Sequence, residues 1–195
     1  MKQLIALSLG FAAVLAISGM VTADDAAAKN DVKSGPQCGD KVGAFYVTKV
    51  AGAEDDGVAE GKNLCYRCRN GSRPQVMVFT RSTSPKVAEL VRKLDGAVAD
   101  NESSQLRVFV NLLGEDKEDL ADQAKKFAAH SKATHIPFVV PNEFENGPDN
   151  YGINAKADVT VTLANESKVE ATYAVAKAEN LDVDSILGDL AKILN

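Results

Sequence analysis

The chain is poor in cysteine, in clustered positive charge and in long apolar segments. It has three cysteines and a formal net charge of −5, and its Lys and Arg residues form no cluster or stripe. A chain without a basic stripe is a poor partner for nucleic acids and other polyanions. Beyond the N-terminus no apolar run approaches the roughly 20 residues that a membrane-spanning helix needs. We therefore expect no nucleic-acid partner and no membrane span after residue 23.

The first 23 residues have the pattern of a secretory signal peptide. Lys2 provides a positive start, residues 4–17 are almost entirely apolar, and Val21-Thr22-Ala23 places small residues at a cleavage site. This pattern predicts export to the periplasm or the extracellular space. An uncleaved anchor is the alternative, whereas a lipoprotein is disfavoured because no cysteine follows the apolar stretch.

The rest of the chain is expected to hold one domain. Residues 24–36 are rich in Ala, Asp and Lys without apolar periodicity, which predicts a flexible leader. Residues 37–195 are enough for one domain with a sizeable core.

The cysteines are odd in number for an oxidising compartment. Cys65 and Cys68 are the natural pair because only two residues separate them. Cys38 is then either a free thiol or the site of an intermolecular link.

Apolar patterns divide this domain into strands and helices. β-branched and aromatic runs predict strands at residues 45–50, 63–66, 75–80, 106–112, 136–140, 158–164 and 168–175. Helical stripes predict helices from Ser84, as N-cap with Pro85 at the first position, to about Gly96, then over 117–130 and 183–194. Residues 69–72 are predicted as a turn. Alternating strands and helices indicate an α/β fold with parallel strands, and the hairpins at both ends add antiparallel ones.

The order of these elements resembles the thioredoxin-like superfamily. The closest resemblance is to its peroxiredoxin and periplasmic thiol-disulfide reductase branch, over roughly residues 39–194. Four segments carry it: GDKVGAF at 39–45, with Gly43 in place of a usual proline; VFVNL with EDKE at 108–118; IPFVV at 136–140; and YGI at 151–153. The resemblance implies a three-layer α/β/α sandwich with a mixed central sheet and an N-terminal β-hairpin.

The resemblance also implies where the reactive sulfur of such proteins would lie. In that branch a cysteine stands at a helix N-terminus after the buried strand, where the helix dipole and free N–H groups lower the thiol pKa. The aligned residues here are Ser84 and Pro85, and Ala157 stands near the position of the cis-proline. Ser84 cannot form a disulfide, so the usual site is expected to be vacated.

The Cys65-x-x-Cys68 pair lies before the buried strand and permits three interpretations. It is a structural disulfide, a relocated redox pair with Arg67, Arg69 and Arg73 favouring the thiolate, or half of a metal site completed by Cys38 with His130 or His135. The spacing matches no common zinc pattern, and we assign no metal or cofactor.

Two functions follow from these interpretations. The first is an exported thioredoxin-like protein whose thiol chemistry, if any, uses Cys65 and Cys68 on exported protein thiols or disulfides. The second is a non-catalytic binding or scaffold domain that uses the crevice around residues 82–85 and keeps Cys65-Cys68 as a structural disulfide.

Overall fold

The structure is a computed structural model and describes residues 32–194. The predicted signal peptide and most of the predicted leader lie outside these residues. Seven strands form one sheet: β1 (Val47–Ala51), β2 (Asn63–Leu64), β3 (Gln75–Thr80), β4 (Arg107–Leu112), β5 (Phe138–Pro141), β6 (Val159–Asn165) and β7 (Lys168–Val175). The helices are α1 (Tyr66–Asn70), α2 (Pro85–Asp100), α3 (Lys117–Ser131), α4 (Val183–Gly188) and α5 (Ala191–Leu194), with 3₁₀ turns η2 (Asp149–Tyr151) and η3 (Ala178–Asn180).

The sheet is mixed, in the order β2-β1-β5-β4-β3-β6-β7. Strands β3, β4 and β5 are parallel, while β1 pairs antiparallel with β5 and β6 pairs antiparallel with β3. The two hairpins, β1–β2 and β6–β7, lie at opposite ends of the sheet. The predicted mixed α/β sheet with an N-terminal hairpin is therefore confirmed.

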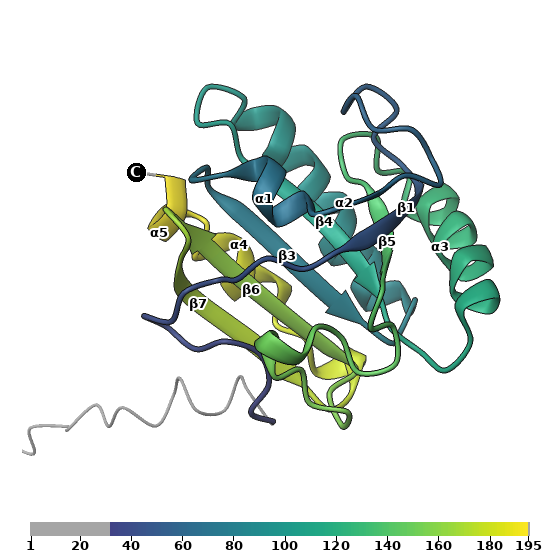
Figure 1. Cartoon of the computed structure of the whole chain (residues 1–195). Helices are drawn as coiled ribbons and strands as arrows, with labels where there is room; N and C mark the ends of the chain where they lie inside the picture. Colours follow the sequence, from purple (N-terminus) through teal and green to yellow (C-terminus); the bar gives the residue numbers. More distant parts are fainter. Residues whose placement is uncertain (1–31, 195) are drawn as a thin grey trace, which may run out of the picture.

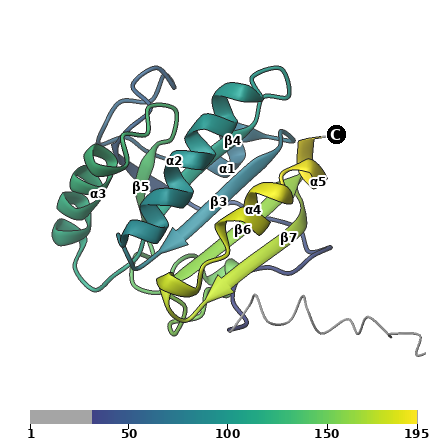
Figure 2. The ribbon, with the colours of Figure 1, turned by 180° about the vertical axis from the view of Figure 1, so that it is seen from behind.

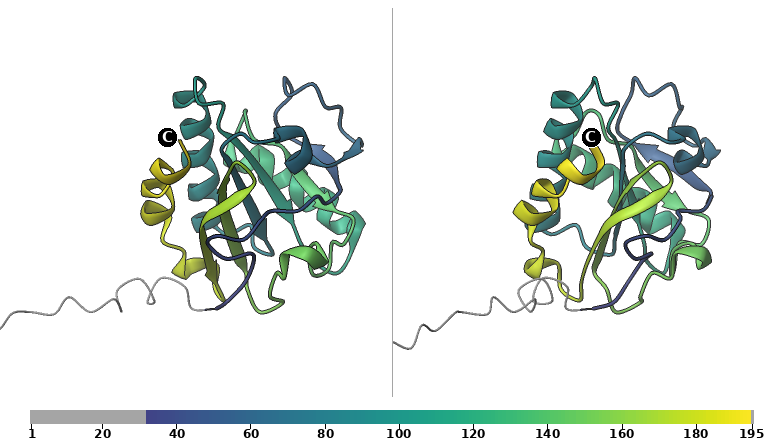
Figure 3. Two further views of the ribbon diagram at one scale, coloured as in Figure 1. Left: turned by 60° about the vertical axis from the view of Figure 1, so that its left-hand side comes forward. Right: turned by 90° about the vertical axis from the view of Figure 1, so that its left-hand side faces the viewer.

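Helices cover one face of the sheet and a thinner layer covers the other. Helices α2, α3, α4 and α5 pack on one face, which Figure 2 shows from behind. The opposite face carries α1, η2 and the chain before β1 (Figures 1 and 3). A hydrophobic core lies on each face of the sheet, and alternate residues of a strand pack into one or the other, because successive side chains of a strand point to opposite faces. Val76 and Val78 of β3 face the helices, whereas Met77 and Phe79 face the α1 side.

The chain before β1 lies against strands β6 and β7, at one edge of the sheet. Ser34 is buried, and its hydroxyl is hydrogen-bonded to that of Thr160 in β6 at 2.6 Å. Further along, Lys41 forms an antiparallel bridge with Lys168, at the start of β7 and on the side away from β6. The end of the segment predicted as a leader, residues 34–36, thus has defined contacts with the sheet.

The structure differs from the predicted elements at three places. Residues 66–70 form helix α1 instead of a strand end followed by a turn. Helix α2 continues past Gly96 to Asp100, because Ala97 and Val98 still pack against the core. The predicted C-terminal helix is two short helices, α4 and α5, separated after Gly188. Within residues 32–194, no helix has the length and apolar character needed to cross a membrane.

Candidate functional site

The Cys65-Cys68 pair lies at the start of α1, on the face opposite α2 (Figure 1). The sulfurs form a disulfide, and the two Cα atoms are 5.2 Å apart. Cys65 is the N-cap residue, and its Sγ accepts a hydrogen bond from the backbone N–H of Cys68 at 3.0 Å. Cys65 is buried, whereas Cys68 is exposed. Cys68 is therefore the more accessible residue of the pair, and an N–H group is in place to stabilise negative charge on Cys65.

Tyr66, between the two cysteines, anchors α1 in the core. Its ring stacks on Phe109 of β4 with centroids 5.7 Å apart. Its hydroxyl donates a hydrogen bond to Oδ2 of Asp56 at 2.6 Å. Burial, followed by this bond to the carboxylate, raises the pKa of Tyr66 well above its usual range. The intervening residue of the motif thus fixes the disulfide helix against the sheet.

The carboxylate that accepts from Tyr66 also forms a buried ion pair, Lys49–Asp56. Lys49 of β1 is only 2% exposed, and its Nζ donates to Asp56 Oδ1, to the carbonyl of Ala53 and to that of Val58, each at 2.8 Å. Asp56 also accepts from the backbone N–H of Val58. All three ammonium donors are therefore used, and the network joins β1, its following loop and α1. The sequence pattern gave no sign of it, because Lys49 lies in a run typical of an ordinary strand.

The three arginines beside the cysteines make other contacts. Arg69 donates to the carbonyl of Asp56, and Arg73 donates to the side chain of Gln105. Nε of Arg67 is buried and has no hydrogen-bond partner in the described part of the chain. Within residues 32–194 none of these guanidinium groups hydrogen-bonds a cysteine sulfur. Their predicted support for a thiolate is thus limited to longer-range attraction.

Ser84 and Pro85 stand at the start of α2, after the loop that leaves β3. Pro85 occupies the first helical position as predicted, and Ser84 is the N-cap residue. The side chain of Ser84 makes no capping hydrogen bond, however, and its Oγ is buried without a partner in residues 32–194. Ser84 is therefore the N-cap residue by position, as predicted, without a capping hydrogen bond from its side chain. The backbone N–H of Ser84 instead donates to Oγ of Ser82 at 3.2 Å, which stabilises the loop and leaves the first turn of α2 uncapped.

Arg81 and Ala157 complete the surroundings of this helix start. Nη1 of Arg81 donates to the carbonyl of Glu145 at 2.6 Å, while its Nε and Nη2 are buried without a partner in the described chain. Burial lowers the pKa of Arg81, and the nearby carboxylate of Asp158 opposes that shift. Ala157 is 3% exposed and precedes β6. The sequence analysis missed Arg81, whose position directly after a buried strand was the available signal.

The chain is similar to known proteins in its fold and not in its sequence. No protein-family model and no curated protein sequence matches the chain. Solved structures do match. One is the crystal structure of a Chlorobium tepidum protein proposed as a thiol:disulfide interchange protein DsbE (15% identity, 81% of this chain and 98% of that chain, TM-score 0.57). Two others are Mycobacterium tuberculosis AhpC (15% identity, 82% and 99%, TM-score 0.57) and peroxidoxin BcpB from the same organism (14% identity, 80% and 97%, TM-score 0.55).

The fold is thioredoxin-like. At these identities the likeness concerns the fold, and it confirms the fold class predicted from the sequence. The assignment of Ser84 and Ala157 to the vacated site of the superfamily stays a prediction.

In this thioredoxin-like chain the cysteine pair and Ser84 lie at opposite ends of the central strand. Cys68 precedes β3 and Ser84 follows it (Figure 1). The six residues of β3 span about 20 Å at roughly 3.3 Å per residue. Helix α1 therefore does not fold over to the start of α2, and the two locations are separate candidate sites.

The metal alternative receives no geometric support. Cys38 is exposed and free, and Cys65 and Cys68 are bonded to each other. His130 lies in the last turn of α3, whereas His135 lies beyond that helix, before β5. Across residues 32–194, no group of three or more His, Cys, Asp or Glu side chains is arranged to hold a metal ion.

Proposed function

We propose that this chain is an exported thioredoxin-like protein that exchanges disulfides with exported protein thiols through Cys65 and Cys68. The observation that carries the proposal is the asymmetry of the disulfide. Cys68 is an exposed residue, whereas Cys65 is buried and its Sγ accepts a hydrogen bond from a backbone N–H at the start of α1. The solved structures of similar fold include a protein proposed as a thiol:disulfide interchange protein, which supports this class of chemistry.

The asymmetry assigns a role to each cysteine. A substrate thiolate attacks Sγ of exposed Cys68, the Cys65–Cys68 bond breaks, and Cys65 leaves as a thiolate that accepts the Cys68 N–H. A second thiolate of the substrate then attacks the substrate sulfur of the mixed disulfide and releases Cys68. The substrate loses two electrons and two protons and gains a disulfide, and Cys65 and Cys68 become thiols.

Export is the second part of the proposal. The signal-peptide pattern around Lys2 and residues 4–17 supports it, although these residues lie outside the described part of the structure. A disulfide is also what an oxidising compartment permits.

A specific observation favours a rival function, a non-catalytic binding domain. At the start of α2, Oγ of Ser84 and both Nε and Nη2 of Arg81 are buried without a protein partner in residues 32–194. Buried polar groups in native proteins usually have partners, so a bound group could supply them. In that case Cys65-Cys68 is a structural disulfide that holds α1.

The test is a thiol-trapping titration of the three cysteines against redox potential, together with insulin-reduction and peroxide-consumption assays. We expect a midpoint above about −300 mV, since structural disulfides lie below that value. Cys65→Ser and Cys68→Ser should abolish activity, and Cys38→Ser, which removes the exposed free thiol, serves as the matched control. A pair that stays oxidised under strong reductant, with mutation lowering only the melting temperature, favours the binding domain.

A further inference from the structure

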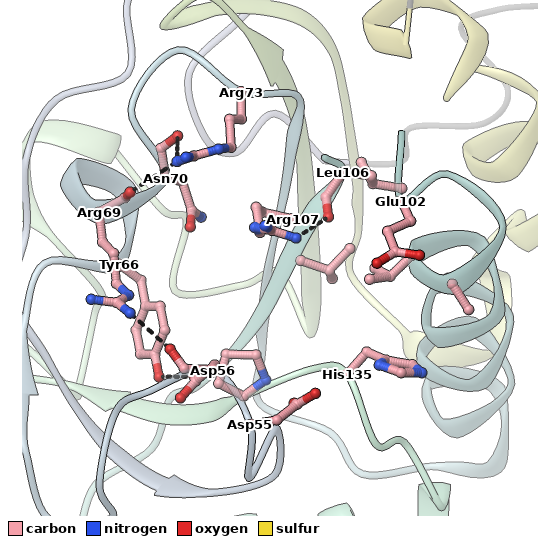
Figure 4. A pocket seen from close by; sticks show the side chains of 14 residues that line it. Asp55, Asp56, Tyr66, Arg69, Asn70, Arg73, Glu102, Leu106, Arg107 and His135 are labelled. Atoms are coloured by element: carbon pink, nitrogen blue, oxygen red, sulfur yellow. Dashed lines mark hydrogen bonds between the residues drawn. The ribbon is translucent and has the colours of Figure 1, made fainter. Parts of the chain in front are cut away.

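A polar cleft of about 610 Å³ opens beside α1, at the edge of the sheet where β3 and β4 begin. Figure 4 shows Arg69 and Asn70 of α1 on one side, Glu102 and His135 on the other, and Arg107 of β4 between them. Ser84 is at the far end of β3 and does not line the cleft. The volume falls in the range of sites for small molecules, roughly 300–1,000 Å³.

Three guanidinium groups in this cleft have no carboxylate partner within residues 32–194. Arg69, Arg73 and Arg107 come from α1, the loop after it and the first position of β4. Their hydrogen bonds within residues 32–194 go only to neutral groups: backbone carbonyls and the side chain of Gln105. Their N–H groups and positive charge are therefore available in a chain whose net charge is −5.

Asn70 adds a neutral donor to the same cleft. The residue is 6% exposed, and its side-chain amide makes no hydrogen bond within residues 32–194, but the amide atoms are not enclosed and face the open cleft. Figure 4 shows this amide directed into the cleft, toward Arg107. An oxygen-bearing ligand in the cleft would accept its N–H in place of water.

The acidic residues of the cleft do not cancel this charge. Asp56 is already bound to Lys49 and to the hydroxyl of Tyr66. Asp55 and Glu102 are exposed, and Figure 4 shows them away from Arg69, on the sides lined by the loop after β1 and the end of α2. The basic side of the cleft therefore keeps its positive charge.

We propose that this cleft binds a small anionic ligand, whose separate carboxylate or phosphate groups are held by the arginines that line it, Arg69, Arg73 and Arg107, with Asn70 as an additional N–H donor. Guanidinium groups bind both kinds of anion in bidentate fashion. Arg69 and Arg73 are neighbours in the sequence, and the fold adds Arg107 to the same cleft. Three arginines in a cleft of this size suit a small anion, whereas the absence of a basic stripe along the chain disfavours a polyanion.

Titration calorimetry with citrate and with pyrophosphate, at about 0.15 M ionic strength to screen diffuse attraction, tests the proposal on the full oxidised protein. We expect saturable one-to-one binding of at least one of them. Citrate alone would identify a carboxylate ligand and pyrophosphate alone a phosphate ligand.

Two variants and one control distinguish binding in this cleft from nonspecific electrostatic attraction. Arg107→Gln and Asn70→Ala should each weaken binding, the first by at least about tenfold, because charge-assisted hydrogen bonds are the stronger ones. Arg92→Gln removes the same charge from an exposed position of α2 outside the cleft and should leave binding unchanged. The proposal is wrong if neither anion binds, if Arg92→Gln weakens binding as much as Arg107→Gln, or if Arg107→Gln and Asn70→Ala have no effect. Activity of Cys65 and Cys68 is not needed for any of these outcomes.

Discussion

Replacing Asp56 by asparagine should strongly destabilise the domain. The substitution keeps a side-chain oxygen of similar position, which can still accept from the hydroxyl of Tyr66. Among residues 32–194, Asp56 is the one carboxylate that faces the ammonium of Lys49, whose other two partners are the carbonyls of Ala53 and Val58, and the substitution removes it. A nearly fully buried positive charge is then left without its counter-ion.

The magnitude follows from the burial of the pair. Removing one partner of a buried ion pair costs about 3–5 kcal/mol. Lys49 is 2% exposed but Asp56 is 19% exposed, so some water reaches the site and the low end, about 3 kcal/mol, is expected. Domains of this kind have a total stability of roughly 5–15 kcal/mol, so the loss is a large fraction of it.

Urea unfolding of the oxidised protein at neutral pH measures the effect. Lys49→Met should also be destabilising, and the double variant should cost less than the sum of the two single ones by about 2 kcal/mol, within the range for residues in contact. Glu89→Gln, which removes the surface ion pairs with Lys86 and Lys93, is the control and should lower the free energy of unfolding far less than Asp56→Asn. Additive single effects, or a loss for Asp56→Asn no larger than that of the control, would refute the described network.

Two further predictions concern alkaline pH and the packing of the chain before β1. Burial raises the pKa of Tyr66, Tyr151 and Tyr173 above the ordinary value, so above about pH 10 the unfolded chain loses tyrosine protons that the folded chain keeps. The folded state then binds more protons, and the unfolding free energy should fall as pH rises, by up to about 1.4 kcal/mol per pH unit for each such tyrosine. Urea unfolding between pH 8 and 11 measures this fall in the free energy of unfolding. The fall should be shallower for Tyr66→Phe and unchanged for Tyr46→Phe, because Tyr46 is 56% exposed. Identical slopes for both variants would contradict the burial of Tyr66. Gly35→Ala should cost about 1 kcal/mol more than Gly39→Ala, because overpacking adds to backbone strain. Both glycines have positive φ, but only at Gly35 would the added Cβ meet another atom, Cγ2 of Thr160 at 2.8 Å. Equal melting temperatures for these two variants would argue against the described packing on β6.

The sheet could be predicted from the sequence because its strands are strongly patterned. Strand β3 has the predicted bounds, since its apolar run is bounded by Pro74 and by the polar residues after Thr80. The β6–β7 hairpin was equally clear, with β-branched runs on both sides of Glu166 and Ser167, which form its turn with positive φ.

Helix α1 could not be predicted because its stability is not local. Five residues are too few for a helical apolar stripe, and isolated helices of that length are unstable. Its conformation depends on the Cys65 cap, the disulfide and the packing of Tyr66 on Phe109.

The polar features of the sites were beyond sequence reasoning for the same reason. The burial of Lys49 depends on the loop after β1 folding back to present Asp56 and two carbonyls. Arg69 and Arg107 are far apart along the chain and line the same cleft only because α1 lies near the start of β4. The pairing of Cys65 with Cys68 and the positions of Ser84 and Pro85 at the start of α2 could be predicted from residue order.

The two edge strands of the sheet, β2 and β7, determine how copies of this protein can associate. Strand β2 offers only two residues for pairing, and the bridge of Lys41 to Lys168 occupies the first part of the outer side of β7. An exposed edge strand can pair with a strand of another molecule and extend the sheet between them. Short or covered edge strands suppress this route to aggregation. Truncating the chain ahead of Val42 would uncover the outer side of β7, so proteolytic trimming there should convert a well-behaved protein into one prone to intermolecular strand addition.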